Sequence, residues 1–131
     1  MNKREQAKKE MYARIERHGE QLKAIFNLPA DTDPIKLCKS LRRIENKAER
    51  YATDYCNGVI DIAEMETSHD KILKAVDKIL KPKQTGVPIF FNQDPRGYAL
   101  KIDDEYIRNN NIRIMTDWGG YGIIAPDLTT N

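Results

Sequence analysis

Apolar residues recur every three or four positions along three consecutive stretches of the first 81 residues, and this spacing constrains the fold more than any other feature. It predicts three amphipathic helices, each with one apolar and one charged face. The three apolar faces are Met11, Ile15, His18, Leu22 and Ile25; Leu37, Leu41, Ile44, Ala48, Tyr51 and Tyr55; and Ile62, Met65, His69, Ile72, Val76 and Ile79. We therefore expect a helical part over residues 1–81.

The residues between these stretches predict where the helices end. Pro29 closes the first, because proline cannot continue a helix. Asp33 and Pro34 suit the N-cap and first position of the second, and Asn57-Gly58 suits its end. The expected helices cover residues 3–26, 34–56 and 61–80. Because the first connection is short, we expect the first two helices to form an antiparallel hairpin.

Shorter apolar runs separated by turn residues follow in the remaining third of the chain. The expected strands cover residues 88–92, 98–102, 112–115 and 121–125, with a short helix at 103–108. The expected fold is therefore α+β, with a mainly antiparallel sheet of about four strands over residues 89–131. A linker at 82–88 would join this sheet to the helices within a single domain of residues 1–131.

Composition excludes several classes of protein. Among 131 residues, 22 Lys and Arg face 20 Asp and Glu, so the net charge of +2 fits neither an acidic nucleic-acid mimic nor a histone-like binder. No apolar run reaches the ~20 residues that span a bilayer, and the charged N-terminus does not resemble a secretory signal. Cys38 and Cys56 would lie roughly 27 Å apart on one helix and cannot pair with each other. We expect a cytoplasmic protein with reduced thiols and no membrane partner.

The small total charge is unevenly distributed. The first two predicted helices each carry +3, whereas their connection and the chain after Cys56 carry −2 each. One stripe of the second helix collects Lys36, Lys39, Arg43, Lys47 and Arg50. This stripe suits nucleic acid or another polyanion. The alternative is a solvated face balanced by acids nearby on the same helix, such as Glu45 and Glu49 beside Arg50.

Two turns of the predicted sheet are candidate ligand sites. In the Asp-Pro-Arg-Gly turn, Arg96 could bind phosphate or carboxylate, with Asp94 orienting it or accepting a ligand hydroxyl. In the Trp-Gly-Gly-Tyr turn, Trp118 and Tyr121 could stack a base together with Tyr98 or Phe91. The alternatives are plain turn chemistry for the first and an aromatic cluster that fills a thin sheet core for the second.

Metal and catalytic motifs are weak. His18 and His69 lie on apolar helical faces and lack the close ligand spacing of structural zinc sites, so core or partly buried histidine is the better interpretation. The chain has no phosphate loop, nucleophile elbow, HExxH or CxxC. Two acidic groups could serve metal-dependent phosphoryl transfer: Asp61, Glu64 and Glu66, or Asp103, Asp104 and Glu105. The alternatives are a helix start with an exposed face for the first group and dipole compensation at a short helix for the second. We expect no catalytic residue, metal or cofactor.

Two segments carry a resemblance to a known group. LRRIENKAERYATDYCNG at residues 41–58 and IFFNQDPRGYALKI at residues 89–102 resemble small uncharacterised proteins of tailed bacteriophages and prophages. In that group a basic helix with a Cys-Asn-Gly-like end precedes a hairpin with a DPRG turn. The resemblance implies synthesis inside a bacterial host and implies no activity. By analogy with small phage accessory proteins, which commonly bind host proteins, nucleic acids or signalling nucleotides, the resemblance suggests such binding, including as an inhibitor of a defence system.

These observations predict a non-enzymatic phage accessory protein that binds a polyanion, either nucleic acid or a nucleotide-like ligand. One alternative is a protein-interaction module that docks on a host protein, and another is a metal-dependent phosphoryl-transfer enzyme. We also expect homo-oligomers, because a 24-residue helix is ~36 Å long and a small domain cannot cover its whole apolar face.

Overall fold

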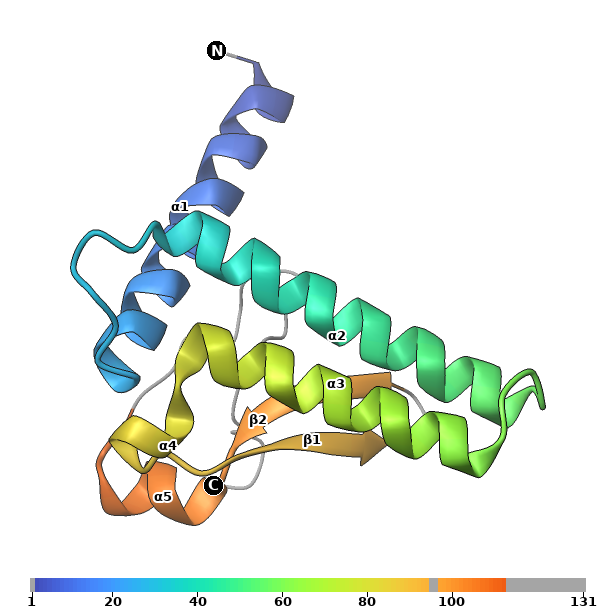
Figure 1. Cartoon of the computed structure of the whole chain (residues 1–131). Coiled ribbons are helices and arrows are strands. Elements are labelled where there is room, and N and C mark those ends of the chain that lie inside the picture. The colour runs from blue at the N-terminus through green and yellow to red at the C-terminus, as the bar shows by residue number, and fades with distance from the viewer. Residues whose placement is uncertain (1, 95–96, 113–131) are drawn as a thin grey trace.

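The computed structural model describes residues 2–94 and 97–112 (Figure 1). These residues form five helices and two strands. In chain order they are α1 (Lys3–Ile25), α2 (Pro34–Cys56), α3 (Ile62–Leu80), α4 (Pro82–Thr85), β1 (Ile89–Asp94), β2 (Gly97–Ile102) and α5 (Asp104–Asn109). The expected α+β class is confirmed, and the predicted ends of the three long helices agree with the structure to within one residue.

Capping side chains explain where the long helices begin. Asn2 Oδ1 accepts a hydrogen bond from Glu5 N at 2.8 Å, and Asp61 Oδ1 accepts one from Glu64 N at 2.8 Å. Asp33 caps α2 by accepting from two backbone amides, and Pro34 occupies the first helical position. Asn57 is the C-cap of α2 and has an ordinary φ of −88°. The next residue, Gly58, is the one in the left-handed region, with a φ of +73°.

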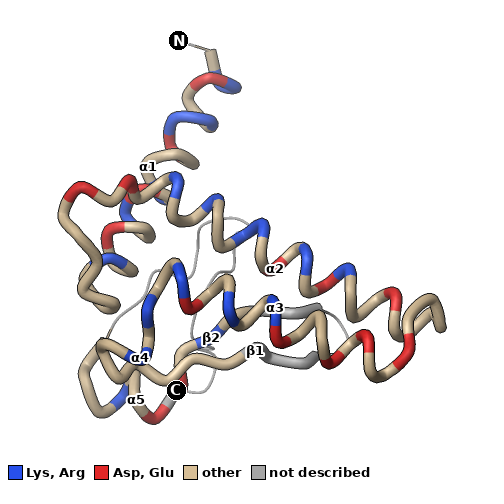
Figure 2. Tube along the Cα trace, viewed as in Figure 1, with Lys and Arg blue, Asp and Glu red and all other residues tan. Residues whose placement is uncertain are grey.

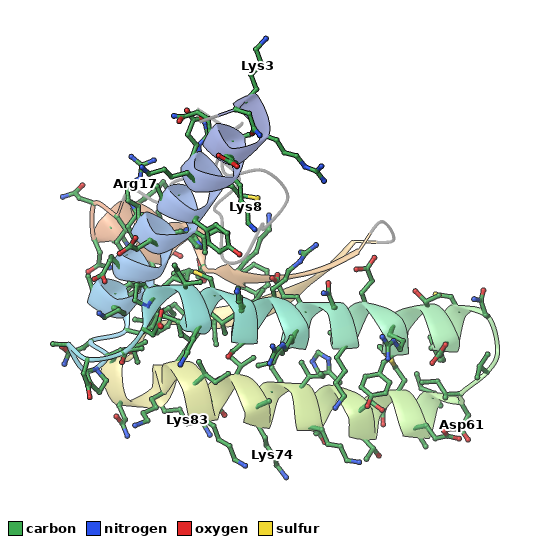
Figure 3. All side chains as sticks on the ribbon, turned by 90° about the horizontal axis from the view of Figure 1, so that it is seen from above. Lys3, Lys8, Arg17, Asp61, Lys74 and Lys83 are labelled. Carbon is green, nitrogen blue, oxygen red and sulfur yellow. The ribbon has the colours of Figure 1, made fainter. Side chains whose placement is uncertain are left out.

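The expected hairpin of the first two helices is wrong. The N-terminal part of α1 projects away from α2, and α1 then crosses the first turns of α2, whereas α2 and α3 lie side by side and antiparallel (Figures 1 and 3). The close approach occurs at Gly19, where a Cβ would lie 2.6 Å from Pro34 Cβ. Nearby, the Cys38 thiol donates to Ile15 O at 3.6 Å. The apolar period predicts which faces are buried, but this local contact determines how the helices cross.

The sheet of the described residues is a single antiparallel hairpin. β1 pairs with β2 from Ile89↔Ile102 to Asp94↔Gly97, so the first two expected strands are confirmed. Of the expected third and fourth strands, only Ile112 belongs to the described residues, and it is not in a strand. The described residues therefore hold a sheet of two strands and not about four, while residues 113–115 of the third expected strand and the whole of the fourth lie outside them.

One apolar core joins the helices to the hairpin. Leu100 and Ile102 of β2 are each 1% exposed, and they belong to the same buried cluster as Leu41 of α2 and Val76 of α3. The expected linker at 82–88 is not an extended spacer, since it holds α4 and the buried Val87. The helical and sheet parts thus form one packed unit.

None of the helices within the described ranges is long and apolar enough to cross a membrane.

Candidate functional site

The predicted basic stripe occupies the solvent side of α2. Steps of three and four residues return to the same side of a helix. All five cations are exposed, and by this spacing the remaining residues on their side between positions 36 and 50 are Ser40 and Asn46, neither of which is acidic. The opposite side carries the buried Leu41 and Ala48. Figure 2 shows the stripe as blue segments that repeat along α2. The five members of the basic stripe are Lys36, Lys39, Arg43, Lys47 and Arg50.

No acid among the described residues forms an ion pair with the cations of the basic stripe. Within the described part of the chain, none of the five forms a salt bridge, while Lys39 Nζ lies 5.6 Å from the centre of the Tyr12 ring of α1. Glu45, which the alternative interpretation pairs with Arg50, is turned into the core instead. The described residues therefore favour an unneutralised cationic surface over a face of paired charges.

The projecting part of α1 adds to this positive charge. Residues 3–14 include five basic and two acidic residues, and every one of them is exposed except the half-buried Tyr12. The ribbon shows this part of α1 extending beyond the rest of the molecule, with Lys3 near its free end (Figures 2 and 3). Its contact with α2 through Tyr12 and Lys39 connects the two basic segments.

Two members of the basic stripe also line a groove between α2 and α3. Arg43 and Lys47 contribute from α2 and Lys71 from α3, and the groove measures about 160 Å³. Its remaining lining is apolar or aromatic and consists of Ile44, Tyr51, Ile72 and Ala75. Sequence reasoning assigned Tyr51 to the core face and gave Lys71 no role. The pairing of α2 with α3, which the helical period does not specify, brings them together.

Glu45 was also missed as a notable residue. It is only 2% exposed, and its Oε2 accepts a hydrogen bond from Leu100 N of β2 at 2.9 Å. Burial raises the pKa of its carboxyl group from 4.5 to about 7, although the Leu100 hydrogen bond and the charge of Arg42 act to lower it. Its spacing in the sequence indicates this burial, because Glu45 stands four residues after Leu41 and three before Ala48 and so shares their apolar side of the helix.

The residues of the two predicted ligand turns are only partly described. Arg96, Trp118 and Tyr121 lie outside the described residues. Asp94 and Tyr98 are placed by their backbone at the end of the hairpin, where Asp94 pairs with Gly97 and Tyr98 with Gln93. The ligand roles of all five residues therefore remain predictions.

The histidines and cysteines occupy the positions that the spacing indicates. His18 is fully buried and His69 half-buried, which confirms their interpretation as core or partly buried residues. Cys38 is buried and Cys56 exposed, and both thiols are free. Among the described side chains, no group of three His, Cys, Asp or Glu residues is arranged to hold a metal ion.

Two acids considered for phosphoryl transfer serve as helix caps. Asp61 Oδ1 accepts from Glu64 N at 2.8 Å, and Asp103 Oδ1 accepts from Glu105 N at 2.9 Å. Both interactions satisfy amides that have no partner within the helix. These contacts agree with the structural alternative for the two acidic groups.

No family model, curated protein or solved structure matches the chain.

Proposed function

We propose that this protein is a non-enzymatic binder of nucleic acid and that the basic stripe of α2 is its principal contact surface. The observation that supports the proposal is the row of five exposed cations without an ion-pair partner among the described residues. The resemblance to phage proteins suggests the cytoplasm of a bacterial host as the setting, where inhibition of a host defence system is one use of such binding.

The dimensions of the basic stripe suit a phosphate backbone. From Lys36 to Arg50 the helix rises about 21 Å, which corresponds to roughly six phosphates along one strand of B-form DNA. Cations that neutralise phosphates release condensed counterions, and this release favours binding at low salt. Arg96, Asp94, Tyr98, Trp118 and Tyr121 are proposed as a second contact for a base or nucleotide.

Salt dependence tests the proposal directly. Fluorescence anisotropy with a labelled duplex, measured from about 50 to 200 mM salt, should give a log–log slope of about −4.5 if all five cations contact phosphates. Replacing Lys36, Lys39 and Arg50 together by Gln should reduce the magnitude of this slope by about 3, because three phosphate contacts are lost.

A matched triple variant separates a specific surface from net charge. Lys74, Lys78 and Lys83 are exposed on α3 and α4, and Figure 3 shows Lys74 and Lys83 on the side of α3 that faces away from α2. Their replacement by Gln removes the same charge and should leave the slope nearly unchanged. Equal losses in the two variants, or no binding of DNA or RNA at low salt, would contradict the proposed surface.

A further inference from the structure

The groove between α2 and α3 suggests which form of nucleic acid the protein prefers. It opens beside the basic stripe, because Arg43 and Lys47 belong to both. The groove combines apolar lining with cations from two helices. This inference rests on the nucleic-acid binding proposed above and identifies the substrate class.

The apolar lining of the groove offers an aromatic surface. Ile44 and Tyr51 contribute from α2, and Ile72 and Ala75 from α3. Ile72 is only 3% exposed, whereas Tyr51 is half-buried and therefore accessible along part of its side chain. Aromatic side chains bind unpaired bases by stacking, which is tolerant of sequence because every base has a π-face.

Three cations border this lining. Arg43 and Lys47 are one helical turn apart, which is about 6 Å along α2. Lys71 approaches from α3, so positive charge lies on both sides of the groove, and no acid is found among its seven described lining residues. A ligand that matches this arrangement carries an apolar group with negative charges on either side of it.

The size of the groove decides between two classes of ligand. About 160 Å³ is well below the ~300–1,000 Å³ of pockets that enclose drug-sized molecules. A helical peptide docks through apolar anchors spread over seven or more residues and needs a longer groove. One planar ring with flanking anions fits better. Bases of a duplex are stacked inside it, so the matching ligand is single-stranded.

We propose that the α2–α3 groove binds one unstacked base of a single-stranded nucleic acid, whose neighbouring phosphates contact Arg43, Lys47 and Lys71. The phosphates beyond them continue along the basic stripe. The protein then binds single strands more tightly than duplexes of the same sequence, because only the single strand can use the groove and the basic stripe together.

Substitution of Tyr51 tests the groove. Anisotropy titrations at fixed salt should compare a labelled oligo-dT and an oligo-U with a duplex of equal length. Tyr51→Leu retains an apolar side chain but removes the aromatic face, so affinity for the single strands should fall about 5- to 100-fold. Duplex affinity should stay within about twofold. Tyr51→Phe should restore single-strand binding, since stacking needs the ring and not the hydroxyl.

Tyr55→Leu is the matched control. Tyr55 lies one turn further along α2, is 41% exposed and does not line the groove. Tyr55→Leu should leave the affinities for single strand and duplex unchanged. Circular dichroism should show that Tyr51→Leu, Tyr51→Phe and Tyr55→Leu are all folded. Lys71→Gln should weaken single-strand binding more than duplex binding, because Lys71 lies outside the basic stripe.

The outcomes separate this inference from the proposed function. Unchanged single-strand affinity in Tyr51→Leu, or equal losses for single strand and duplex, overturns the groove as a base site while the basic-stripe variants still report on nucleic-acid binding. Failure of the proposed function shows instead as binding that is insensitive to the basic-stripe triple. Tyr51-dependent binding of an acidic amphipathic peptide, without binding of oligo-dT or oligo-U, assigns the groove to a protein partner and also overturns the inference.

Discussion

Glu45 places a carboxylate within the otherwise apolar buried side of α2. Its Oε2 accepts from Leu100 N, and this bond connects α2 to the hairpin. No hydrogen-bond partner for its Oε1 is present among the described residues. Removal of a carboxylate from water disfavours its charged form, which explains why burial raises its pKa to about 7. Arg42 and Glu49 are the charged groups that act on it, in opposite directions.

The pH dependence of stability should report this residue. The folded-state pKa lies above the ordinary value of 4.5, so the folded protein holds the proton more tightly than the unfolded chain. The stabilising contribution is complete below pH 4.5 and is lost as pH rises to and through about 7. A pKa difference of about 2.5 corresponds to about 3 kcal/mol. Urea unfolding of the unsubstituted protein and of Glu45→Gln from pH 4 to pH 8 measures this contribution to stability.

Glu45→Gln keeps an acceptor for Leu100 N and removes the titration. Its unfolding free energy relative to that of the unsubstituted protein should therefore rise by about 3 kcal/mol between pH 4 and pH 8. Glu105→Gln is a suitable control because Glu105 is exposed and lies in the first turn of a different helix, α5. Parallel pH profiles for the unsubstituted protein and Glu45→Gln would show that the carboxyl group does not titrate in this way.

The two cysteines should differ in reactivity. Cys56 is exposed, whereas Cys38 is buried and its thiol pKa is raised to about 12 by burial. Thiolate is the reactive form, so a maleimide at pH 7 should label one thiol per folded chain and two after unfolding. Mass spectrometry counts the labels. Cys56→Ser should abolish fast labelling, and rapid labelling of Cys38 in the folded state would indicate that α1 and α2 separate readily.

At the scale of elements, the crossing of α1 and α2 depends on a glycine. Gly19 is buried in α1, and a Cβ at this position would meet the backbone carbonyl and side chain of Pro34. Pro34 is the first residue of α2 and follows the capping Asp33, so the start of the helix cannot shift without losing its cap. Two rigid elements therefore meet at a point where only hydrogen fits.

Gly19→Ala tests this contact because two effects oppose each other. Alanine favours the helix by about 1 kcal/mol, whereas a clash with backbone costs about 1–3 kcal/mol or more. We expect the clash to dominate and the free energy of unfolding to fall by about 1–2 kcal/mol. Chemical denaturation measures the change, and Ala13→Gly, at an exposed position of α1, calibrates the propensity term. A more stable Gly19→Ala variant would show that the helices move apart at little cost.

At the scale of the molecule, the core leaves part of α1 uncovered. Ile15 and Leu22 are buried within the chain, whereas Met11 is 37% exposed and residues 2–10 are all exposed. The expected apolar face is therefore covered by the chain itself except at its beginning. Short helical segments without tertiary packing are marginal in water, so we expect a second surface to stabilise this segment.

The expected homo-oligomer remains a prediction, and Met11 is the residue through which to test it. Native mass measurement at tens of micromolar should give a multiple of the 15.1 kDa chain mass. Met11→Glu places a charge on the uncovered face and should shift the mass to that of one chain. Lys83→Glu, on the exposed surface of α4, serves as control. A mass of 15.1 kDa at every concentration would contradict the prediction.

The agreement between expectation and structure follows the range of the interactions. The ends of α1, α2 and α3 and the β1–β2 pairing depend on residues close in sequence, such as Asp33 beside Pro34, and they were predicted well. The α1–α2 crossing and the burial of Glu45 depend on contacts between distant segments. The period of a helix shows which side is buried without showing what covers it.

The candidate site divides in the same way. The sequence by itself determined the basic stripe, because residues three and four apart share a helix face whatever lies behind it. The tertiary structure alone decided that Glu45 does not pair with Arg50 and that Lys71 of α3 joins Arg43 and Lys47 around the groove. Which elements pack beside a helix depends on the whole core. α2 contacts α1, α3 and β2 at once, so its neighbours cannot be derived from its own apolar period.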